Sequence, residues 1–449
     1  MKAKTFSVKI KHKIKPFNKI IHVDSDKSLS IRSFLIGAIC QNVSTAKNIL
    51  ESEDVHSTIT ACRKLGVKII KIKKGNYKIF GKGLGSLLAT RNMKIDFGNS
   101  GTLARLLIGI LSTTPNIEIN IRGDNSLNKR SMKKIINLMS EFGAFFLPKR
   151  KYNFPLKMIS SQMPVGINYS AGVSAQLKSA VILAGLNSYG KTQIFEKVKS
   201  RDHTENLLRK NTDVITVKDG INKKKISVIG KKYLNSFNVN ISGDPSSSAF
   251  FAALTLLNKD SKITIRNVGL NPTRIGFYQL LKKQNARVKF INIKKENNEV
   301  KGDIIVKSCK LKPIHSPSYI YPSTADEYPI LFVVAALTNG ISVFKGIGDL
   351  ANKESNRIKE MQKILAQIGI KTKSTKDEIK IFGKGMINAS NKKIKVPSIL
   401  DHRIAMSAFI LGTLTNAETS IKNFATVFTS SPSFLKIMKS LGAKFEIQN

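Results

Sequence analysis

Acids, arginines and other hydrogen-bonding residues stand at the starts of five very apolar segments of the sequence. A polar group beside a buried apolar helix is unfavourable unless it has a partner, and a helix N-terminus attracts anions through its unpaired N–H groups. The residues at these starts are Lys27, Ser28 and Arg32; Asn99, Gly101, Thr102 and Arg105; Ser174 and Gln176; Asp326 and Glu327; and Asp401, His402 and Arg403. The shared pattern predicts a site for phosphates and carboxylates.

Three further segments carry charged residues that could join such a site. They are NKESNRIKE, with Lys353, Glu354 and Arg357; RGDNSLNKRSM, with Arg130; and VKSRDHTENLL, with Arg201, His203 and Glu205. Taken singly, each residue could equally be a helix cap, a structural ion pair or part of a solvated helix face. The six histidines have no close metal-ligand spacing, so no metal site is predicted.

Two sequence patterns that recur along the whole chain indicate the elements that carry these residues. One is an amphipathic helix that ends at a small or polar residue and is followed by a short strand; in four copies that residue is Gly66, Gly143, Gly369 or Gly442. A glycine there predicts a left-handed backbone at the end of the helix. The other is a polar start followed by an almost wholly apolar helix, which must be buried on nearly all sides.

Both patterns occur six times, with a period of about 75 residues, and β-rich stretches lie between the helices. Each repeat is therefore predicted to contain strands, one buried helix and one outer helix. The N-cap residue types before the apolar helices favour helix starts at those positions. Six units divide naturally into two lobes of three, with a break near Ile241 to Asp244. The fold class predicted is α/β.

Composition limits the possible functions. With 449 residues, 41% of them hydrophobic, the chain is long enough for two or three domains. Three separated cysteines and no long apolar run favour a protein of a reducing compartment without a membrane span. Because the net charge is +46, nucleic-acid binding has to be considered as a function. The lysines are spread along the chain and form no basic tail, which favours a solvated basic surface instead. The basic and apolar alternation of the first 15 residues predicts a strand rather than a signal peptide.

Ten segments, in order and spacing, resemble the 5-enolpyruvylshikimate-3-phosphate synthase family over essentially the whole chain. They are DKSLSIR, GNSGTLAR, SAQLKSAVILAGLN, SRDHTENLL, GDPSSSAFF, NPTRIGF, ADEYPIL, KESNRIK, LDHRIAM and SSPSFL. The resemblance implies a two-lobed, inside-out α/β barrel fold with three repeated units in each lobe. One lobe would be 25–243 and mainly bind shikimate 3-phosphate; the other would be 1–24 with 244–449 and hold the catalytic acids. The active site would lie in the cleft between them.

The resemblance also implies a role for individual residues. Shikimate 3-phosphate would be bound by Lys27, Ser28, Arg32, Ser174, Ala175, Gln176, Arg201, Asp326 and Lys353. Phosphoenolpyruvate would be bound by Lys27, Asn99, Gly101, Arg130, Gln176, Arg357 and Arg403. The reaction would be addition of the 5-hydroxyl to C2 of the enolpyruvyl group, protonation at C3, and elimination of phosphate. We expect Asp326 to accept the hydroxyl proton, Glu354 to handle the proton at C3, and Lys27 to assist at the leaving phosphate.

The family pattern implies no cofactor, no nucleic-acid or membrane partner, a monomer and a cytoplasmic location. The chain departs from the pattern at Asp24-Ser25, where Pro-Gly is frequent, and at Gly101, where some members have Ala. Two other functions stay open on the sequence alone. The sister enzyme that transfers enolpyruvate to a UDP-sugar shares fold and donor but normally has a reactive cysteine in its first lobe, and a basic RNA-binding repeat scaffold would explain the charge.

Overall fold

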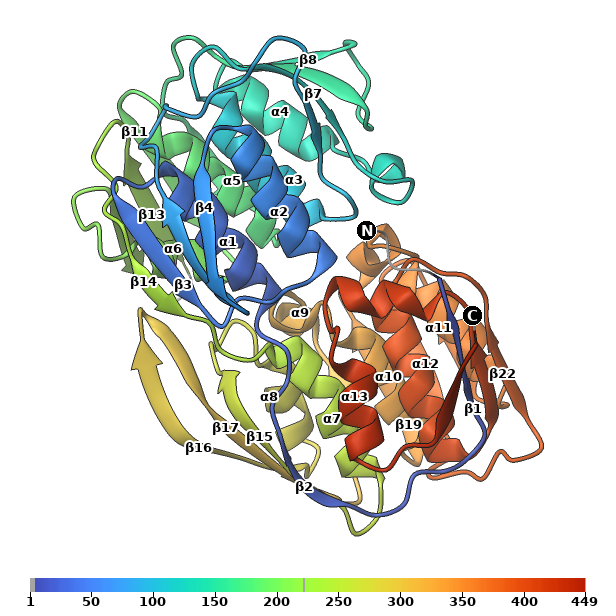
Figure 1. Ribbon diagram of the computed structural model, residues 1–449. Coiled ribbons are helices and arrows are strands. Elements are labelled where there is room, and N and C mark those ends of the chain that lie inside the picture. Colours follow the sequence, from blue (N-terminus) through green and yellow to red (C-terminus); the bar gives the residue numbers. More distant parts are fainter. Residues whose placement is uncertain (1–4, 221–222, 449) are drawn as a thin grey trace. The chain divides into compact units, whose positions relative to one another are not determined.

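The computed structural model describes residues 5–220 and 223–448. The chain divides into two compact units: unit 1 comprises residues 5–24, 242–296 and 300–448, and unit 2 comprises 25–241 with 297–299. Each unit in Figure 1 contains a central group of helices with sheets around it. Residues 1–4 of the predicted N-terminal strand lie outside the described residues, and the strand itself, β1, is Ser7–Ile10. No helix among the described residues is long and apolar enough to cross a membrane.

Unit 2 contains three helix pairs, each consisting of one buried and one outer helix. The buried helices are α1 (Lys27–Ile39), α3 (Gly101–Ser112) and α5 (Ala175–Leu186), and the outer helices are α2 (Glu53–Lys64), α4 (Lys133–Glu141) and α6 (His203–Leu208). The strands are β3 (Val43–Lys47), β4 (Lys68–Lys73), β5 (Asn76–Phe80), β6 (Lys94–Asp96), β7 (Glu118–Arg122), β8 (Phe145–Leu147), β9 (Leu156–Ile159), β10 (Asn168–Ala171), β11 (Lys191–Glu196), β12 (Ile215–Asp219), β13 (Lys224–Ile229) and β14 (Asn238–Asn240), with the 3-10 turn η1 (Leu127–Lys129).

Unit 1 repeats this plan. Its buried helices are α7 (Pro245–Leu257), α10 (Tyr328–Ala336) and α12 (His402–Thr415), its outer helices are α8 (Gly276–Lys282), α11 (Arg357–Ala366) and α13 (Phe434–Ser440), and α9 (Tyr321–Thr324) is a single turn. Its strands are β1, β2 (Asn18–Ile21), β15 (Lys262–Gly269), β16 (Arg287–Glu296), β17 (Glu299–Lys307), β18 (His315–Ser316), β19 (Gly340–Lys345), β20 (Lys371–Ser374), β21 (Glu378–Gly383), β22 (Lys393–Val396), β23 (Glu418–Ile421) and β24 (Phe445–Gln448), with 3-10 turns η2 (Ser318–Ile320), η3 (Gly348–Asn352) and η4 (Phe424–Thr429).

Within the described residues the strands form six four-stranded sheets, three in each unit. In β10-β11-β13-β12, the first pair is parallel and the other two pairs are antiparallel. The sheets β14-β3-β5-β4 and β6-β7-β9-β8 have the same pattern. The predicted α/β fold of six repeated units is therefore confirmed. Three sheets are completed by strands distant in sequence: β14 pairs with β3, β2 pairs with β15, and β1 pairs with β23 and β24.

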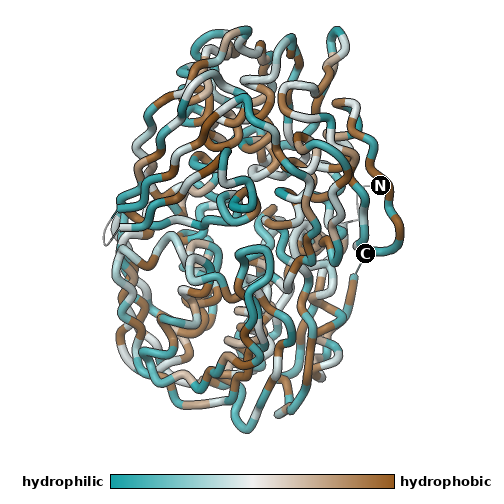
Figure 2. Tube along the Cα trace, turned by 90° about the vertical axis from the view of Figure 1, so that its left-hand side faces the viewer, coloured by the Kyte–Doolittle hydropathy of each residue, from teal (hydrophilic) through white to brown (hydrophobic). Residues whose placement is uncertain are grey.

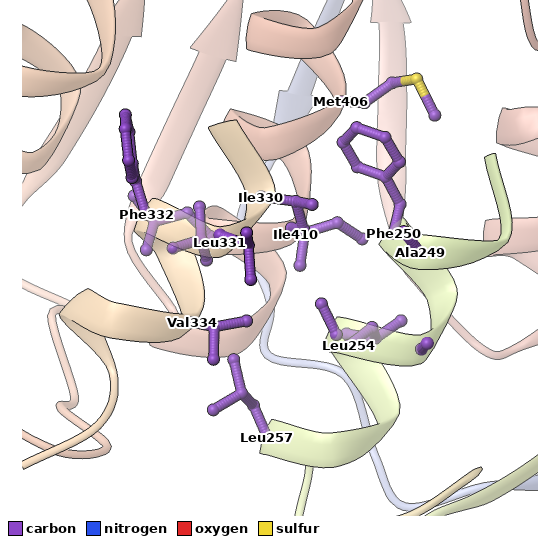
Figure 3. Packing of buried hydrophobic residues seen from close by; sticks show 14 of the residues in the cluster. Ala249, Phe250, Leu254, Leu257, Ile330, Leu331, Phe332, Val334, Met406 and Ile410 are labelled. Atoms are coloured by element: carbon purple, nitrogen blue, oxygen red, sulfur yellow. The ribbon is translucent and has the colours of Figure 1, made fainter. Parts of the chain in front are cut away.

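The buried helices form the core of each unit. In α1 every residue from Leu29 to Ile39 is buried, and α7 is buried along its whole length. Figure 3 shows side chains of α7, α10 and α12 pointing toward one another, among them Leu254, Val334 and Ile410. Figure 2 shows hydrophobic and hydrophilic residues alternating along many outer strands, as expected for sheets with one buried face. Side-chain caps at Asp26, Ser100, Ser174, Asp244 and Asp401 begin five of the buried helices, as predicted.

Glycines allow the close approaches that the repeats need. Gly66, Gly143, Gly369 and Gly442 all have the positive φ that was predicted for the ends of the outer helices. At Gly81, which follows β5, an added Cβ would lie 2.0 Å from the carbonyl oxygen of Cys40 at the end of α1. The equivalent contacts recur at Gly230 and Gly383, so any larger residue would push the third strand of the sheet off the end of its buried helix.

Asp24 lies at the point where the chain leaves unit 1 for unit 2. Its carboxylate accepts hydrogen bonds from Ser431 Oγ at 3.0 Å and Ser433 N at 2.9 Å, and its carbonyl accepts one from Asp244 N at 2.8 Å. Burial raises the pKa of Asp24, and the hydrogen bonds from Ser433 and Ser431 offset only part of that rise. The charged carboxylate is thus less favourable in the folded protein than in the unfolded chain.

We expect Asp24→Asn to stabilise the protein at neutral pH. When folding raises the pKa of a group, the folded protein loses stability as the pH rises from the group's ordinary pKa, about 3.9 for Asp, through its pKa in the folded state. The uncharged amide removes this loss and keeps one acceptor oxygen for the Ser433 N–H. Thermal melting at pH 7 and at pH 3.5 measures the effect: the variant should melt higher at pH 7, and the difference should shrink at pH 3.5. A variant that melts lower at both pH values would contradict the expectation.

Candidate active site

A buried arginine in unit 1 gathers three carboxylates from separate segments. Arg357, the first residue of α11, has a side chain that is only 1% exposed. Its Nε lies 2.9 Å from Asp401 Oδ2, its Nη2 lies 2.6 Å from Glu354 Oε2, and its Nη1 lies 3.6 Å from Asp326 Oδ1. Asp326 stands in the turn between α9 and α10, and Asp401 caps α12. The ends of three helices therefore meet at one guanidinium.

Electrostatics explain why this charge is tolerated inside the protein. Burial alone would lower the pKa of Arg357, but the surrounding carboxylates, led by Asp401, outweigh burial and raise the pKa above its ordinary range. The guanidinium is therefore fixed as a cation. Asp326 and Glu354 keep part of their side chains exposed, at 26% and 22%. Both acids are thus held by a buried cation while they remain open to solvent on another side.

Lys353 and Arg403 flank this group. Lys353 Nζ lies 2.9 Å from Asp349 Oδ2 and 5.8 Å from the centre of the Tyr321 ring, and Tyr321 donates to the same carboxylate at 2.9 Å. Arg403 is in the first turn of α12, where its backbone N–H is capped by Asp401 Oδ1 at 3.0 Å and its guanidinium lies 5.7 Å from the centre of the Phe250 ring.

The Arg403 side chain is buried with unused hydrogen-bonding capacity. The residue is 3% exposed, and its Nε and Nη1 have no hydrogen-bond acceptor among the described residues. Buried guanidinium N–H groups are nearly always hydrogen-bonded because leaving them unpaired is costly. A planar set of donors in this state fits the oxygens of a carboxylate or a phosphate. Arg403 is therefore the residue whose geometry points most directly to an anionic ligand.

A second polar group in unit 2 joins the starts of α3 and α5. Arg130 Nη2 donates to Asn99 Oδ1 at 2.6 Å. Arg105 Nη1 donates to the carbonyl of Gly101 at 3.1 Å and to Gln176 Oε1 at 2.9 Å. Gln176 Nε2 in turn donates to Thr102 Oγ1 at 3.0 Å. The Gly101 N–H donates to the Asn99 carbonyl at 3.0 Å, so two helix N-termini and two arginines belong to one continuous hydrogen-bonded group.

The start of α1 contributes a buried arginine and a partly buried lysine. Arg32 donates from Nε to Thr204 Oγ1 at 2.9 Å and from Nη1 to the carbonyl of Ser28 at 3.0 Å. The first residue of α1, Lys27, forms an ion pair of 3.0 Å with Asp54 in the first turn of α2. Ser174 caps α5 through Leu177 N, Ala175 is the first residue of that helix, and Arg201 stands just before α6.

The residues predicted to bind substrates or act in catalysis are divided between the two units. Asp326, Lys353, Glu354, Arg357 and Arg403 lie in unit 1, and the others with such a predicted role lie in unit 2. The sequence singled out Asp401 and Arg105 only as residues at helix starts, and it missed Asp54 entirely. An acid in the first turn of an ordinary helix, such as Asp54, carries no distinctive signal. Among the described residues, no group of three His, Cys, Asp or Glu side chains could hold a metal ion.

Comparison with known proteins decides the family. A family model for EPSP synthase (3-phosphoshikimate 1-carboxyvinyltransferase) matches residues 11–438. The chain belongs to the EPSP synthase family. It is 37% identical over 441 residues to the 3-phosphoshikimate 1-carboxyvinyltransferase of Zymomonas mobilis, covering 98% of this chain and 97% of the relative. It is 40% identical over 418 residues to the enzyme of that name from Thermodesulfovibrio yellowstonii, covering 93% and 95%.

Solved structures agree with membership of the EPSP synthase family. EPSP synthase from Acinetobacter baumannii matches with a TM-score of 0.84 and 35% identity, covering 99% of this chain and all of that one. The enolpyruvyl transferase NikO from Streptomyces tendae matches with a TM-score of 0.74 and 11% identity over 99% of both chains, which shows a shared fold. This EPSP synthase family member is a transferase. A UDP-sugar enolpyruvyl transferase is the less supported alternative, because the matching family model and both relatives are named 3-phosphoshikimate 1-carboxyvinyltransferase.

Proposed function

We propose that this protein transfers the enolpyruvyl group of phosphoenolpyruvate to the 5-hydroxyl of shikimate 3-phosphate and releases phosphate. Family membership over residues 11–438 supports the reaction. Among the features of the site, the one that carries the proposal is Arg403. Its buried Nε and Nη1 have no acceptor within the part of the chain that the structure describes, and it lies beside a cluster that holds two partly exposed acids. The residues of both units serve one reaction on this substrate pair. We also propose, as the sequence predicted, a monomer that acts in the cytoplasm.

The unit 1 group provides the acid–base chemistry. The 5-hydroxyl oxygen adds to C2 of the enolpyruvyl group while its proton passes to Asp326, and Glu354, acting as the acid, gives its proton to C3, which yields the tetrahedral adduct. Loss of the C3 proton to Glu354 then re-forms the double bond as the C2–O bond to phosphate breaks. Arg357 holds both carboxylates in place, which fixes the groups that exchange protons with the substrate.

The arginines and the helix starts bind the two anions. Arg130, Arg357 and Arg403 bind the carboxylate and phosphate of phosphoenolpyruvate, together with Asn99, Gly101 and Gln176. Ser28, Arg32, Ser174, Ala175, Gln176, Arg201, Asp326 and Lys353 bind shikimate 3-phosphate, and Lys27 contacts both substrates and assists the departing phosphate. Fixed cations and helix N-termini stabilise the dense negative charge of the adduct without reorganising during the reaction.

Phosphate release by the purified protein tests the proposal. We expect release that requires both phosphoenolpyruvate and shikimate 3-phosphate, with enolpyruvylshikimate 3-phosphate formed in equal amount. UDP-N-acetylglucosamine in place of shikimate 3-phosphate should give no release. Release with the UDP-sugar alone, or no release with either acceptor, would overturn the proposal.

Gly101→Ala tests the predicted phosphoenolpyruvate site. An added Cβ would lie 2.7 Å from Arg105 Nη1, so that side chain must move, and 3.2 Å from Arg130 Nη1, so that side chain must give way slightly. Because a displacement on the ångström scale weakens a precisely held ligand, we expect the KM for phosphoenolpyruvate to rise about tenfold, the equivalent of 1.4 kcal/mol. The KM for shikimate 3-phosphate should change less than about twofold. Steady-state kinetics with each substrate varied checks both values, and an unchanged KM for phosphoenolpyruvate would contradict the placement.

A further inference from the structure

Unit 2 contains a fully buried ion cluster that the reaction does not use directly. Lys178 of α5 has a side-chain exposure of 0%, as do its two partners, Glu196 and Glu205. Lys178 Nζ lies 2.9 Å from Glu196 Oε1 and 2.8 Å from Glu205 Oε1. Lys224 adds a second cation 3.5 Å from Glu205. The rest of α5 from Ala180 to Leu186 is apolar or small and is buried throughout.

Stability alone does not account for such a cluster. Replacing a buried ion pair with apolar residues of similar volume is often neutral or stabilising, because charges lose their hydration on burial. Burial lowers the pKa of Lys178, but the two glutamates outweigh it and raise the pKa. Burial by itself would raise the pKa of Glu205, but Lys178 and Lys224 together outweigh burial and lower that pKa. Both groups are therefore charged at neutral pH, and a geometric role becomes the better explanation.

Three polar groups of Ser200 form hydrogen bonds with the cluster. The backbone N–H of Ser200 donates to Glu196 Oε1 at 2.9 Å, its hydroxyl donates to the same oxygen at 2.6 Å, and its carbonyl accepts from Lys178 Nζ at 3.4 Å. On the other side of Arg201, Asp202 lies 3.8 Å from Lys224. The residue that precedes Arg201 and the residue that follows it are thus both tied to the cluster.

The cluster lies close in sequence to the predicted substrate residues. Lys178 is in the first turn of α5, which Ser174 caps, and Glu205 is in the first turn of α6, which begins two residues after Arg201. The Lys178–Glu205 ion pair therefore joins the first turn of α5 to the first turn of α6, next to Ser174 and Arg201.

The neighbouring residues extend this connection to α1. Ser179 Oγ accepts from Thr204 Oγ1 at 2.8 Å and from Arg32 Nη2 at 3.2 Å. Arg32 also donates to Thr204. The adjacent residues 178–179 of α5 and 204–205 of α6 thus make contacts that include a third residue predicted to bind shikimate 3-phosphate.

We propose that the buried cluster of Lys178, Glu196 and Glu205 positions Arg201 for the phosphate of the acceptor substrate. The proposal rests on the proposed function for the identity of that substrate. The cluster acts through Arg201 and touches no substrate itself. It makes the Ser200–Asp202 segment and the start of α5 a single rigid phosphate-binding surface, so its loss should weaken shikimate 3-phosphate binding and leave phosphoenolpyruvate binding unchanged.

The test replaces the pair Lys178 and Glu196 together by methionine. The double variant removes one charge of each sign, keeps similar side-chain volumes and leaves Glu205 with Lys224. It also removes every acceptor that Glu196 offers to Ser200. The matched control, Arg266→Met with Asp303→Asn, removes a partly buried ion pair of 2.6 Å in unit 1. The control measures the effect of losing an ion pair away from Arg201.

Two measurements decide the proposal. Without substrates, hydrogen exchange at the amides of residues 200–202 should be at least tenfold faster in the double variant than in the wild type, and unchanged in the control. In kinetics, the KM for shikimate 3-phosphate should rise about tenfold in the variant while the KM for phosphoenolpyruvate stays within about twofold. The proposal would be overturned if the amides of residues 200–202 exchanged equally fast in the double variant and the wild type, or if the KM values for both substrates rose equally.

A conservative variant covers failure of the double variant to fold. Glu196→Gln keeps the shape and one acceptor oxygen while removing one charge, and we expect about a threefold rise in the KM for shikimate 3-phosphate alone; unchanged values would overturn the proposal. Failure of the proposed function is distinguishable, because the wild type would then release no phosphate with shikimate 3-phosphate. The exchange measurement on substrate-free protein would still decide whether the cluster orders residues 200–202.

Discussion

Replacing Asp326 by Asn should lower the turnover number by about 10²-fold or more, while the Kd for shikimate 3-phosphate stays within about twofold. Loss of a positioned general base has this scale of effect. The amide keeps the volume of the carboxylate and one oxygen that faces Arg357, which lies 3.6 Å from Asp326 in the wild type. The proton of the 5-hydroxyl then has no acceptor at that position, so addition to C2 becomes slow.

Single-turnover phosphate release, together with calorimetric titration of shikimate 3-phosphate, separates the chemical step from binding. Glu360→Gln is the control, because Glu360 is an acid of α11, the helix that begins at Arg357, and pairs with the exposed Lys363 at 2.9 Å. The control should turn over at the wild-type rate. Near-normal turnover in Asp326→Asn, or a loss of shikimate 3-phosphate affinity that accounts for the whole effect, would remove Asp326 from the proposed role.

The features that the sequence predicted are local or periodic. Gly66 and Gly442 carry a left-handed backbone because a helix that turns into a strand needs one, and this requirement is visible within a few residues. The caps at Asp26 and Asp244 are equally local. Repetition of these signals six times was sufficient to predict the number of units, since each repeat reports the same architecture independently.

Contacts between distant segments could not be predicted in the same way. The partner of Lys27 is Asp54, 27 positions further along the chain, and nothing in the type or spacing of that acid distinguishes it from any other residue of a helix first turn. The pairing of β14 with β3 joins residues about 190 positions apart. Family resemblance supplied roles for Lys27 and Arg357, but the structure was needed to show which side chains hold them.

Asp401 illustrates why a site residue can be mistaken for a structural one. Its position before an apolar helix indicates an N-cap, and its Oδ1 does accept from Arg403 N at 3.0 Å. Its other oxygen lies 2.9 Å from Arg357 Nε and accepts from Ser355 Oγ at 3.0 Å. One carboxylate thus caps the helix that carries Arg403 and also binds the arginine that holds Asp326 and Glu354, the two proposed catalytic acids.

Replacing Arg357 by Met should affect both stability and catalysis. The substitution leaves the fully buried Asp401 and the partly exposed Glu354 and Asp326 without their common cation. Removing one partner of a buried ion pair costs roughly 3–5 kcal/mol of unfolding free energy, and losing a preorganised donor lowers the turnover number by about 10²–10³-fold. Burial without a counter-charge raises the pKa of a carboxyl group, so the variant should regain stability as pH falls.

Urea unfolding at pH 7 and pH 5 measures the stability effect. A double variant, Arg357→Met with Asp401→Asn, separates the effect on stability from the effect on catalysis. Asn is as good an N-cap as Asp, so the double variant removes the buried charge, keeps the start of α12 and should recover much of the lost stability. It should not recover turnover, because Asp326 and Glu354 still lack the guanidinium that fixes them. Recovery of both properties would mean that Arg357 only balances the charge of Asp401, and it would exclude the role in holding the catalytic acids.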